Sequence, residues 1–310
     1  MRILFMGTPE FAVPSLDVLN KNHEIVGIFT KVDKPNTRGG KIKFTPVKEY
    51  GLAHNIPVYQ PNNLRDEETY ALVKEINPDL IVVVAYGKII PNNIIEFPKY
   101  GIINVHSSLL PKYRGAAPIN AAIVAGEKES GVTIMDIAEE LDAGDIIEVG
   151  KTEIKPEDNF ITLHDRLKEI GAQTLLTAVN KIFAGTAVRT PQDSSKATFV
   201  KPFKKEDCKI KWDKTSEEIF NLVRGMTPFP GVFSEVDGKI VKIIEVQKSE
   251  NIYADKLCGE VVDKDKHKGF IVKTCDSSVI LTKIKPENKS IISGVDAING
   301  KQLKIEDVLR

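Results

Sequence analysis

Residues 104–115 combine side chains that can move a proton and stabilise negative charge on an oxygen atom. The segment reads Asn-Val-His-Ser-Ser-Leu-Leu-Pro-Lys-Tyr-Arg-Gly and begins where an apolar, strand-like run ends. Side chains two positions apart lie on the same side of a strand, so Asn104 and His106 can address one atom. A histidine exchanges a proton near neutral pH, and a carboxamide can donate to a developing oxyanion. The alternative is a structural role, because an isolated histidine is commonly part-buried for packing.

A second candidate segment, residues 141–145, reads Leu-Asp-Ala-Gly-Asp and lies between two β-prone runs. Asp and Gly are common in turns, so the simplest interpretation is that both aspartates only build a turn. Taken alone, the residues of this segment favour that interpretation.

The first half of the chain predicts an α/β domain with a Rossmann-like, mostly parallel sheet. Short β-rich runs alternate there with helical patterns, as in βαβ units, and ligands of such sheets bind at the carboxyl ends of the strands. The opening strand is followed by Gly7-Thr8-Pro9 rather than G-x-G-x-x-G, which argues against an NAD-dependent oxidoreductase. We expect strands at residues 3–6, 25–29, 80–85, 102–105 and 132–137, and helices at 13–19, 46–54, 67–76, 118–124 and 162–183.

The second half predicts a smaller β-barrel domain. A helical pattern is followed by Thr-Pro-Phe-Pro-Gly, which forces a turn, and by several short β-prone runs. We therefore divide the chain into a catalytic domain at residues 1–189, a polar linker at 190–207 and a C-terminal domain at 208–310. We expect a helix at 216–225 and strands at 232–236, 239–246, 259–263, 269–274 and 279–285.

Composition narrows the possible classes. The formal net charge is +0, which argues against a protein coated in basic charge for non-specific nucleic-acid binding. The N-terminus lacks the pattern of a signal peptide and no apolar run is long enough for a membrane span, so we expect a cytoplasmic protein that does not enter a membrane. The three cysteines are far apart and lack metal-ligand spacing, so we expect neither a disulfide nor a metal site.

Residues 104–115 and 141–145 together resemble the formyltransferases that use 10-formyltetrahydrofolate. The family pattern Asn-x-His-x-Ser-Leu-Leu-Pro-x-Tyr-Arg-Gly is matched in full, and a downstream Leu-Asp-x-Gly-Asp follows in the same order. The resemblance implies that Asn104, His106 and Asp142 are catalytic. It also implies that 10-formyltetrahydrofolate is the formyl donor. Family members often have a glycine where this chain has Glu140, and we expect the loop to adjust and keep Asp142. The tetrahydrofolate-binding segment of the family corresponds to Ser108, Leu109, Leu110 and Pro111.

Several members of this family share the catalytic residues, including those that act on glycinamide ribonucleotide, on amino sugars, or as a hydrolase. The opening of the chain, a basic insertion and the C-terminal region resemble the branch that formylates methionyl-initiator tRNA. The resemblance implies that Arg38 and its neighbours Lys41 and Lys43 contact the tRNA, although a solvated basic loop is the alternative. It also implies an OB-fold-like, tRNA-binding C-terminal domain. Residues 205–310 hold 19 Lys and Arg against 18 Asp and Glu, so composition supports that role only weakly. We expect a monomer.

Overall fold

A computed structural model describes residues 1–35 and 42–310. The chain forms two compact units, and both are discontinuous in sequence. The first, the catalytic unit, comprises Met1–Gly115, Glu129–Glu153 and His164–Phe199. The second, the C-terminal unit, comprises Ala116–Lys128, Ile154–Leu163 and Val200–Arg310.

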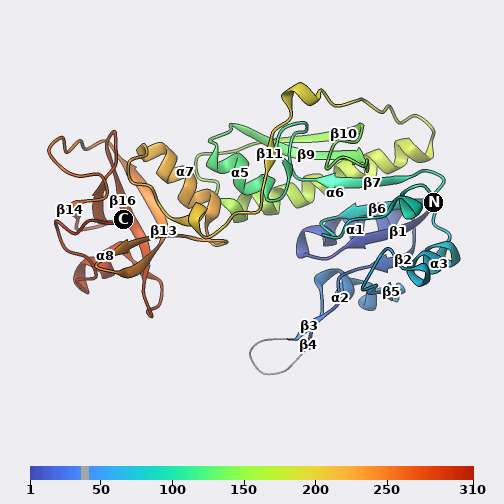
Figure 1. The fold of residues 1–310 in the computed structure, drawn as a ribbon, viewed down its shortest axis with the longest axis horizontal. Helices are drawn as coiled ribbons and strands as arrows, with labels where there is room; N and C mark the ends of the chain where they lie inside the picture. The colour runs from blue at the N-terminus through green and yellow to red at the C-terminus, as the bar shows by residue number, and fades with distance from the viewer. Residues whose placement is uncertain (36–41) are drawn as a thin grey trace. The chain divides into compact units, whose positions relative to one another are not determined.

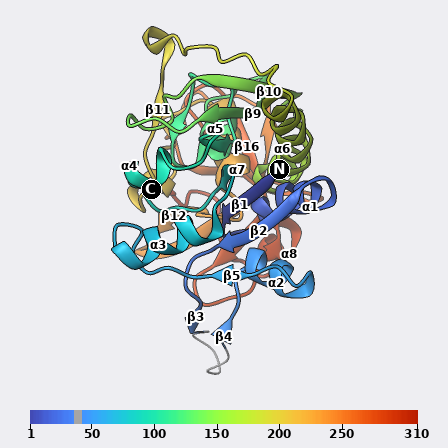
Figure 2. The same ribbon diagram turned by 90° about the vertical axis from the view of Figure 1, so that its right-hand side faces the viewer.

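The catalytic unit is built on a mixed, mostly parallel sheet (Figures 1 and 2). Within the described residues the strand order is β10-β9-β7-β6-β1-β2-β5. Neighbours from β7 to β5 are parallel, whereas β9 and β10 are antiparallel to their neighbours. The predicted Rossmann-like α/β fold is therefore confirmed. The strands are β1 (Arg2–Gly7), β2 (Glu24–Phe29), β5 (Val58–Tyr59), β6 (Leu80–Val84), β7 (Ile102–His106), β9 (Glu129–Asp136) and β10 (Ile146–Glu153).

Helices cover this sheet because their apolar residues recur at helical spacing. Leu4 and Met6 of β1 share one buried cluster with Val73 and Ile76 of a helix. The longest helix packs through Gly171, whose added Cβ would contact side chains of β7 and β9. Local signals start other helices, as where Thr45 and Asp66 accept N-cap hydrogen bonds. The helices are α1 (Val13–Asn22), α2 (Pro46–Ala53), α3 (Glu67–Ile76), α4 (Asn92–Ile95) and α6 (Phe160–Phe183), with 3-10 turns η1 (Glu10–Ala12) and η2 (Ser194–Lys196).

Two short strand pairs accompany the main sheet. One is an antiparallel pair, β3 (Lys34–Pro35) with β4 (Ile42–Lys43). The other joins β8 (Arg114–Gly115) to β11 (Phe199–Val200). The second pair carries residues from the end of the 104–115 segment, so the chain at 199–200 lies against that segment.

The C-terminal unit is an antiparallel sheet that its own last residues close. The strand order is β12-β13-β16-β15-β14, with β17 paired to β16. The backbone of Arg310 exchanges hydrogen bonds with Glu235 of β12. On the other side, the N–H of Leu309 donates to the carbonyl of Gly259, and the N–H of Glu306 donates to the carbonyl of Val261, the first residue of β14. Both edge strands are thus joined through residues 306–310, as expected for a small barrel. The strands are β12 (Val232–Val236), β13 (Lys239–Ser249), β14 (Val261–Asp265), β15 (Gly269–Lys273), β16 (Ser278–Pro286) and β17 (Ile292–Ser293).

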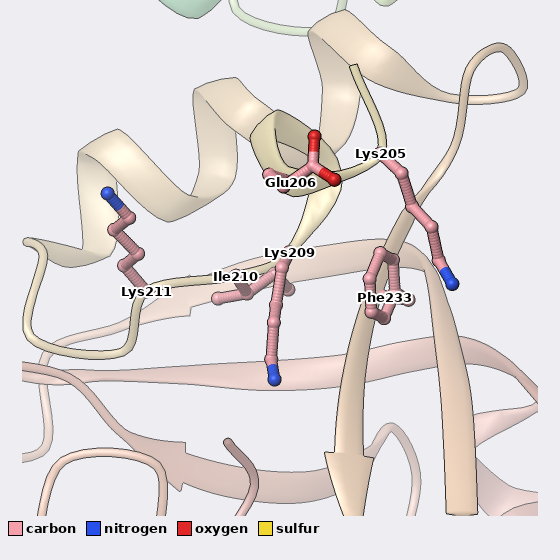
Figure 3. A pocket seen from close by; sticks show the side chains of 6 residues that line it. All are labelled: Lys205, Glu206, Lys209, Ile210, Lys211 and Phe233. Carbon is pink, nitrogen blue, oxygen red and sulfur yellow. The ribbon is translucent and has the colours of Figure 1, made fainter.

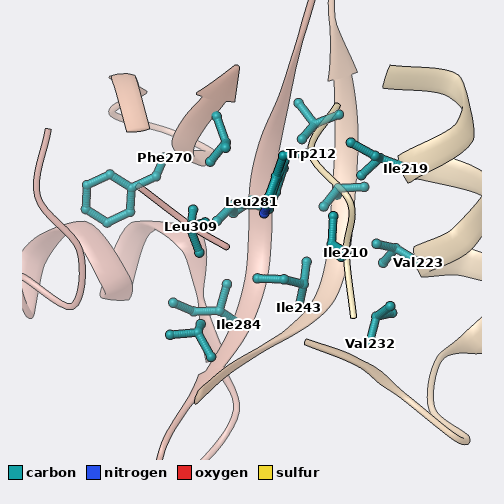
Figure 4. Close-up of a cluster of buried hydrophobic side chains, with 14 of the residues drawn as sticks. Ile210, Trp212, Ile219, Val223, Val232, Ile243, Phe270, Leu281, Ile284 and Leu309 are labelled. Atoms are coloured by element: carbon teal, nitrogen blue, oxygen red, sulfur yellow. The ribbon is translucent and has the colours of Figure 1, made fainter. Parts of the chain in front are cut away.

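The core of the C-terminal unit packs helices against the sheet (Figure 4). Trp212 is 4% exposed, and its Nε1 donates to Ser234 at 3.0 Å. A capping box at Thr215 begins α7, which packs on α5. Asn120 of α5 donates its side-chain N–H to the carbonyl of Gly225, at 2.7 Å. The helices are α5 (Pro118–Val124), α7 (Ser216–Met226), α8 (Gly294–Asn299) and the 3-10 turn η3 (Glu206–Cys208).

In the part of the chain that the structure describes, no helix has both the length and the apolar composition needed to cross a membrane.

Candidate active site

The strand β7 carries two of the predicted catalytic residues at the edge where parallel strands end. Asn104 is half-buried and His106 is 6% exposed. Asn104 pairs with Val83 of β6 on one side and with Met135 of β9 on the other. Residues 104 and 106 share one face of the sheet because side chains alternate along a strand. The backbone therefore presents the carboxamide and the imidazole to the same side.

The imidazole of His106 lies between two hydrogen-bond acceptors. Its Nε2 is 2.9 Å from the carbonyl oxygen of Tyr113. Its Nδ1 is 3.6 Å from Oδ2 of Asp142, a charge-pair distance longer than a hydrogen bond. A carbonyl only accepts hydrogen bonds, so Nε2 donates to Tyr113 and Nδ1 is the ring nitrogen that faces the carboxylate. Catalytic contacts of this kind often tighten only when substrate binds.

The loop that carries Asp142 holds its carboxylate through the backbone of the 104–115 segment. Oδ2 of Asp142 accepts the N–H of Gly115 at 2.8 Å. Asp142 itself has φ of 51°, a left-handed conformation that non-glycine residues adopt rarely. At Gly144 an added Cβ would lie 1.8 Å from the carbonyl oxygen of Asp136, so only glycine fits. The turn is therefore specialised, and it brings Asp142 to His106.

The predicted folate segment, residues 108–111, is anchored to β9 by one hydroxyl. Thr133 is 0% exposed, donates its Oγ1 to the carbonyl of Ser108 at 2.7 Å and accepts the N–H of Leu110 at 3.2 Å. Ser108 in turn donates its hydroxyl to the carbonyl of Lys112 at 2.7 Å. The peptide bond between Leu110 and Pro111 is cis. Leu109 lies against Gly131, where an added Cβ would come within 2.4 Å of its side chain.

Arg114, inside the same motif, is fully buried, and the residues around it were not predicted to take part. Its Nε and Nη2 donate to Oε1 of Gln192 at 3.1 and 2.9 Å, and its Nη1 donates to Glu140 at 3.1 Å. The unusual Glu140 thus contacts the motif arginine. A buried arginine needs hydrogen-bond acceptors nearby. The arginine of the motif was the one residue in the sequence that could have indicated such neighbours.

Two side chains that follow β6 have shifted pKa values. Burial raises the pKa of Tyr86 to about 12. Burial, with a contribution from the positive charge of Lys31, lowers the pKa of Lys88. The Nζ of Lys88 donates to the carbonyl of Asn62 at 2.9 Å. These groups lie in the catalytic unit, but no predicted role falls on them.

Of the three predicted tRNA contacts, the structure describes Lys43. Arg38 and Lys41 lie outside the described residues. Lys43 lies in β4 and is exposed. Within residues 1–35 and 42–310, no group of His, Cys, Asp or Glu side chains has the arrangement of a metal site.

A basic cavity of about 390 Å³ lies in the C-terminal unit (Figure 3). The Nζ of Lys205 is 5.8 Å from the centre of the Phe233 ring, and Figure 3 shows the two side chains next to each other. Lys209 forms an ion pair with Glu235 at 3.2 Å. The cavity therefore combines cations with an aromatic face. It is lined by Lys205, Glu206, Lys209, Ile210, Lys211 and Phe233.

Similarity to known proteins covers nearly the whole chain. Residues 1–179 match the formyl transferase family model, and residues 202–302 match that of the formyl transferase C-terminal domain. The chain is 56% identical over 309 residues to a methionyl-tRNA formyltransferase of Fusobacterium nucleatum subsp. nucleatum, covering 100% of both proteins. A methionyl-tRNA formyltransferase of Sulfurihydrogenibium sp. is 46% identical, covering 98% of both.

Solved structures share the fold at lower identity. The sugar 3N-formyltransferase WlaRD, solved with dTDP and 5-N-formyl-THF, superposes with a TM-score of 0.67 and 23% identity over 94% of this chain and 99% of that one. HypX of Aquifex aeolicus in complex with tetrahydrofolic acid gives a TM-score of 0.65 and 19% identity, over 98% of this chain and 48% of HypX. These structures support the fold, and the full-length sequence matches decide the family. The chain belongs to the methionyl-tRNA formyltransferase family.

Proposed function

We propose that this protein transfers the formyl group of 10-formyltetrahydrofolate to the free amino group of methionyl-initiator tRNA, with Asn104, His106 and Asp142 as catalytic residues. The observation that carries the proposal is the approach of His106 Nδ1 to Asp142 Oδ2, 3.6 Å apart, in a chain that matches its relatives over its full length. We place the reaction in the cytoplasm, where translation begins, and infer that the protein acts as a monomer.

The reaction moves one proton and stabilises one developing negative charge. The amine attacks the formyl carbon, the carbonyl oxygen gains negative charge, and the tetrahydrofolate nitrogen leaves with a proton while the amine loses one. His106 is suited to exchange a proton with the reacting amine. The carboxamide of Asn104, on the same face of the strand, can donate a hydrogen bond to the oxyanion. The carboxylate of Asp142 faces Nδ1 of the imidazole and orients the ring.

The donor substrate is proposed to bind along residues 108–111. Thr133 fixes two backbone groups of this segment, so its shape is set before the folate arrives. A pre-formed segment loses little conformational freedom on binding, which favours affinity. Ser108, Leu109, Leu110 and Pro111 are the proposed contacts.

The tRNA is proposed to bind the basic residues Arg38, Lys41 and Lys43 and the cavity of the C-terminal unit. Lysine and arginine side chains supply affinity for phosphates, and an aromatic ring such as Phe233 can stack on a base. The near-neutral charge of this unit means that a local patch, rather than an overall field, provides the attraction. Arg38→Ala and Lys205→Ala are expected to raise KM for tRNA and to lower its salt dependence without changing KM for the folate.

The decisive experiment measures formyl transfer from labelled 10-formyltetrahydrofolate to three acceptors in parallel. The acceptors are methionylated initiator tRNA, glycinamide ribonucleotide and an amino-sugar nucleotide. Transfer only to the tRNA is the expected result. Preferential transfer to one of the two small amines would refute the proposal that tRNA is the acceptor.

The catalytic assignment is tested in the same assay. His106→Ala is expected to lower kcat by about 10²- to 10⁴-fold, and Asn104→Ala by about 10²- to 10³-fold. His54→Ala is the matched control, because His54 is an exposed histidine at the end of α2. Full activity in His106→Ala, or an equal loss in the control, would contradict the assignment.

A further inference from the structure

The side chain of Gln192 connects the buried Arg114 to the backbone of the Asp142 loop. Its Oε1 accepts from Nε and Nη2 of Arg114 at 3.1 and 2.9 Å. Its Nε2 donates to the carbonyl oxygens of Asp142 at 2.9 Å and Gly144 at 2.8 Å. The carboxamide therefore uses both its acceptor and its two donors.

Chemistry fixes the orientation of this carboxamide. An arginine only donates hydrogen bonds, and a backbone carbonyl only accepts them. The oxygen of Gln192 must therefore face Arg114, and its nitrogen must face the loop. Arg114 is 0% exposed, so it cannot turn to solvent for another acceptor. A side chain at position 192 without the oxygen leaves Arg114 without this acceptor, and one without the nitrogen leaves the carbonyls of Asp142 and Gly144 without this donor.

The loop needs such support because its conformation is unfavourable by itself. Asp142 has φ of 51°, and a non-glycine residue in the left-handed region persists only when its surroundings hold it there. Three contacts do so in this structure. Gln192 binds the carbonyls of Asp142 and Gly144, the N–H of Gly115 binds the carboxylate, and Thr190 exchanges hydrogen bonds with Ile146 at 2.8 and 2.9 Å.

We propose that Gln192, backed by Arg114, is a positioning residue that sets the place of the Asp142 carboxylate beside His106. Gln192 acts on the loop backbone, so it has no direct contact with the reacting atoms in this assignment. Glu140 also binds Arg114 but its side chain is 65% exposed, and an exposed ion pair contributes little, so it is not part of the proposal. The inference rests on the proposed role of Asp142 in formyl transfer.

The test variant is Gln192→Glu, which keeps the size of the side chain and its contact with Arg114. It replaces the donor that faces two carbonyl oxygens by an acceptor, so the loop is expected to shift. A misplacement of about 1 Å can cost about 10²-fold in rate, and we expect kcat to fall by that order with KM for folate and for tRNA unchanged. Gln173→Glu, the same exchange at an exposed position of α6, is the control and is expected to leave kcat as in the unmodified protein.

A double-mutant cycle separates positioning from general damage. If Gln192 acts through Asp142, Gln192→Glu combined with Asp142→Asn should lose no more activity than Asp142→Asn alone. Losses that multiply, or a rise in both KM values without a fall in kcat, would overturn the inference. If thermal unfolding shows that Gln192→Glu does not fold, Gln192→Met, of similar length but without the four hydrogen bonds, takes its place.

The outcomes also separate this inference from the proposed function. An unmodified protein that transfers no formyl group to any acceptor refutes the proposed function. Transfer that depends on Asp142 but not on Gln192 leaves the function in place and refutes only the positioning role.

Discussion

Replacing Thr133 by valine tests whether one hydroxyl holds the proposed folate segment. Valine has nearly the same shape, but it cannot donate to the carbonyl of Ser108 or accept from the N–H of Leu110. Each buried backbone group left without a partner costs about 1 to 3 kcal/mol. The methyl group that replaces the hydroxyl returns about 1 kcal/mol by its burial. We therefore expect Thr133→Val to lower the free energy of unfolding by about 2 kcal/mol.

Urea unfolding followed by circular dichroism measures this change. A loss of about 2 kcal/mol corresponds to about 4 to 8 °C in Tm for a domain of 150 to 250 residues. Thr133→Ser keeps the hydroxyl and is the matched control. Because the displaced backbone belongs to residues 108–111, KM for 10-formyltetrahydrofolate is expected to rise more than KM for tRNA in the valine variant. A valine variant as stable as the serine variant, with the same KM for the folate, would refute the reasoning.

The remaining predictions concern a buried phenol, the Asp142 loop and the end of the chain. The hydroxyl of Tyr86 has no hydrogen-bond partner among the described residues, so Tyr86→Phe is expected to raise the free energy of unfolding by about 1 kcal/mol at pH 8. The pKa of Tyr86 is raised from 10.0 to about 12. The unfolded chain therefore releases a proton between these values that the folded chain keeps, and stability falls as pH rises through this window. Between pH 8 and pH 11, urea unfolding should show a smaller fall in the free energy of unfolding for Tyr86→Phe than for the unmodified protein. Equal falls in the two proteins would contradict the effect of burial on Tyr86. Gly144→Ala should lower kcat by about 10²-fold because the added methyl displaces Asp142, and an active alanine variant would show that the loop tolerates the shift. Deleting residues 306–310 should leave β12 and β14 open and make the C-terminal unit sensitive to protease, whereas unchanged resistance would show that the sheet does not need this closure.

Elements with strong local patterns could be predicted from the sequence. The bounds of α3, α5 and β12 agree with the prediction at both ends, because caps, prolines and periodicity are local signals. The run after residues 141–145 is recognised only as β-prone, without bounds, and in the structure it is the strand β10. Its sequence includes Gly150 and several charged residues, and it is a strand because β9 lies beside it. Tertiary pairing of this kind overrides weak local preference.

The site shows the same division between local and long-range information. The motif spacing placed Asn104 and His106 on one face of a strand, as the structure has them, and their catalytic roles stay predictions. Gln192 could not be found in this way, because its contact with Asp142 joins residues 50 positions apart. Its neighbours are polar, and that composition indicated a linker. The hydrogen bonds that join residues 190–199 to the rest of the catalytic unit became visible only in the structure.

The discontinuity of the C-terminal unit has a consequence for the newly synthesised chain. Asn120 of α5 binds the carbonyl of Gly225, which is made 105 residues later. At about 5 to 20 residues per second, α5 waits on the order of 5 to 20 s for this partner. Ile123, whose side chain lies against Gly225 of α7 in the finished protein, lacks that cover during this time. The nascent protein therefore exposes this apolar part of α5 until α7 emerges.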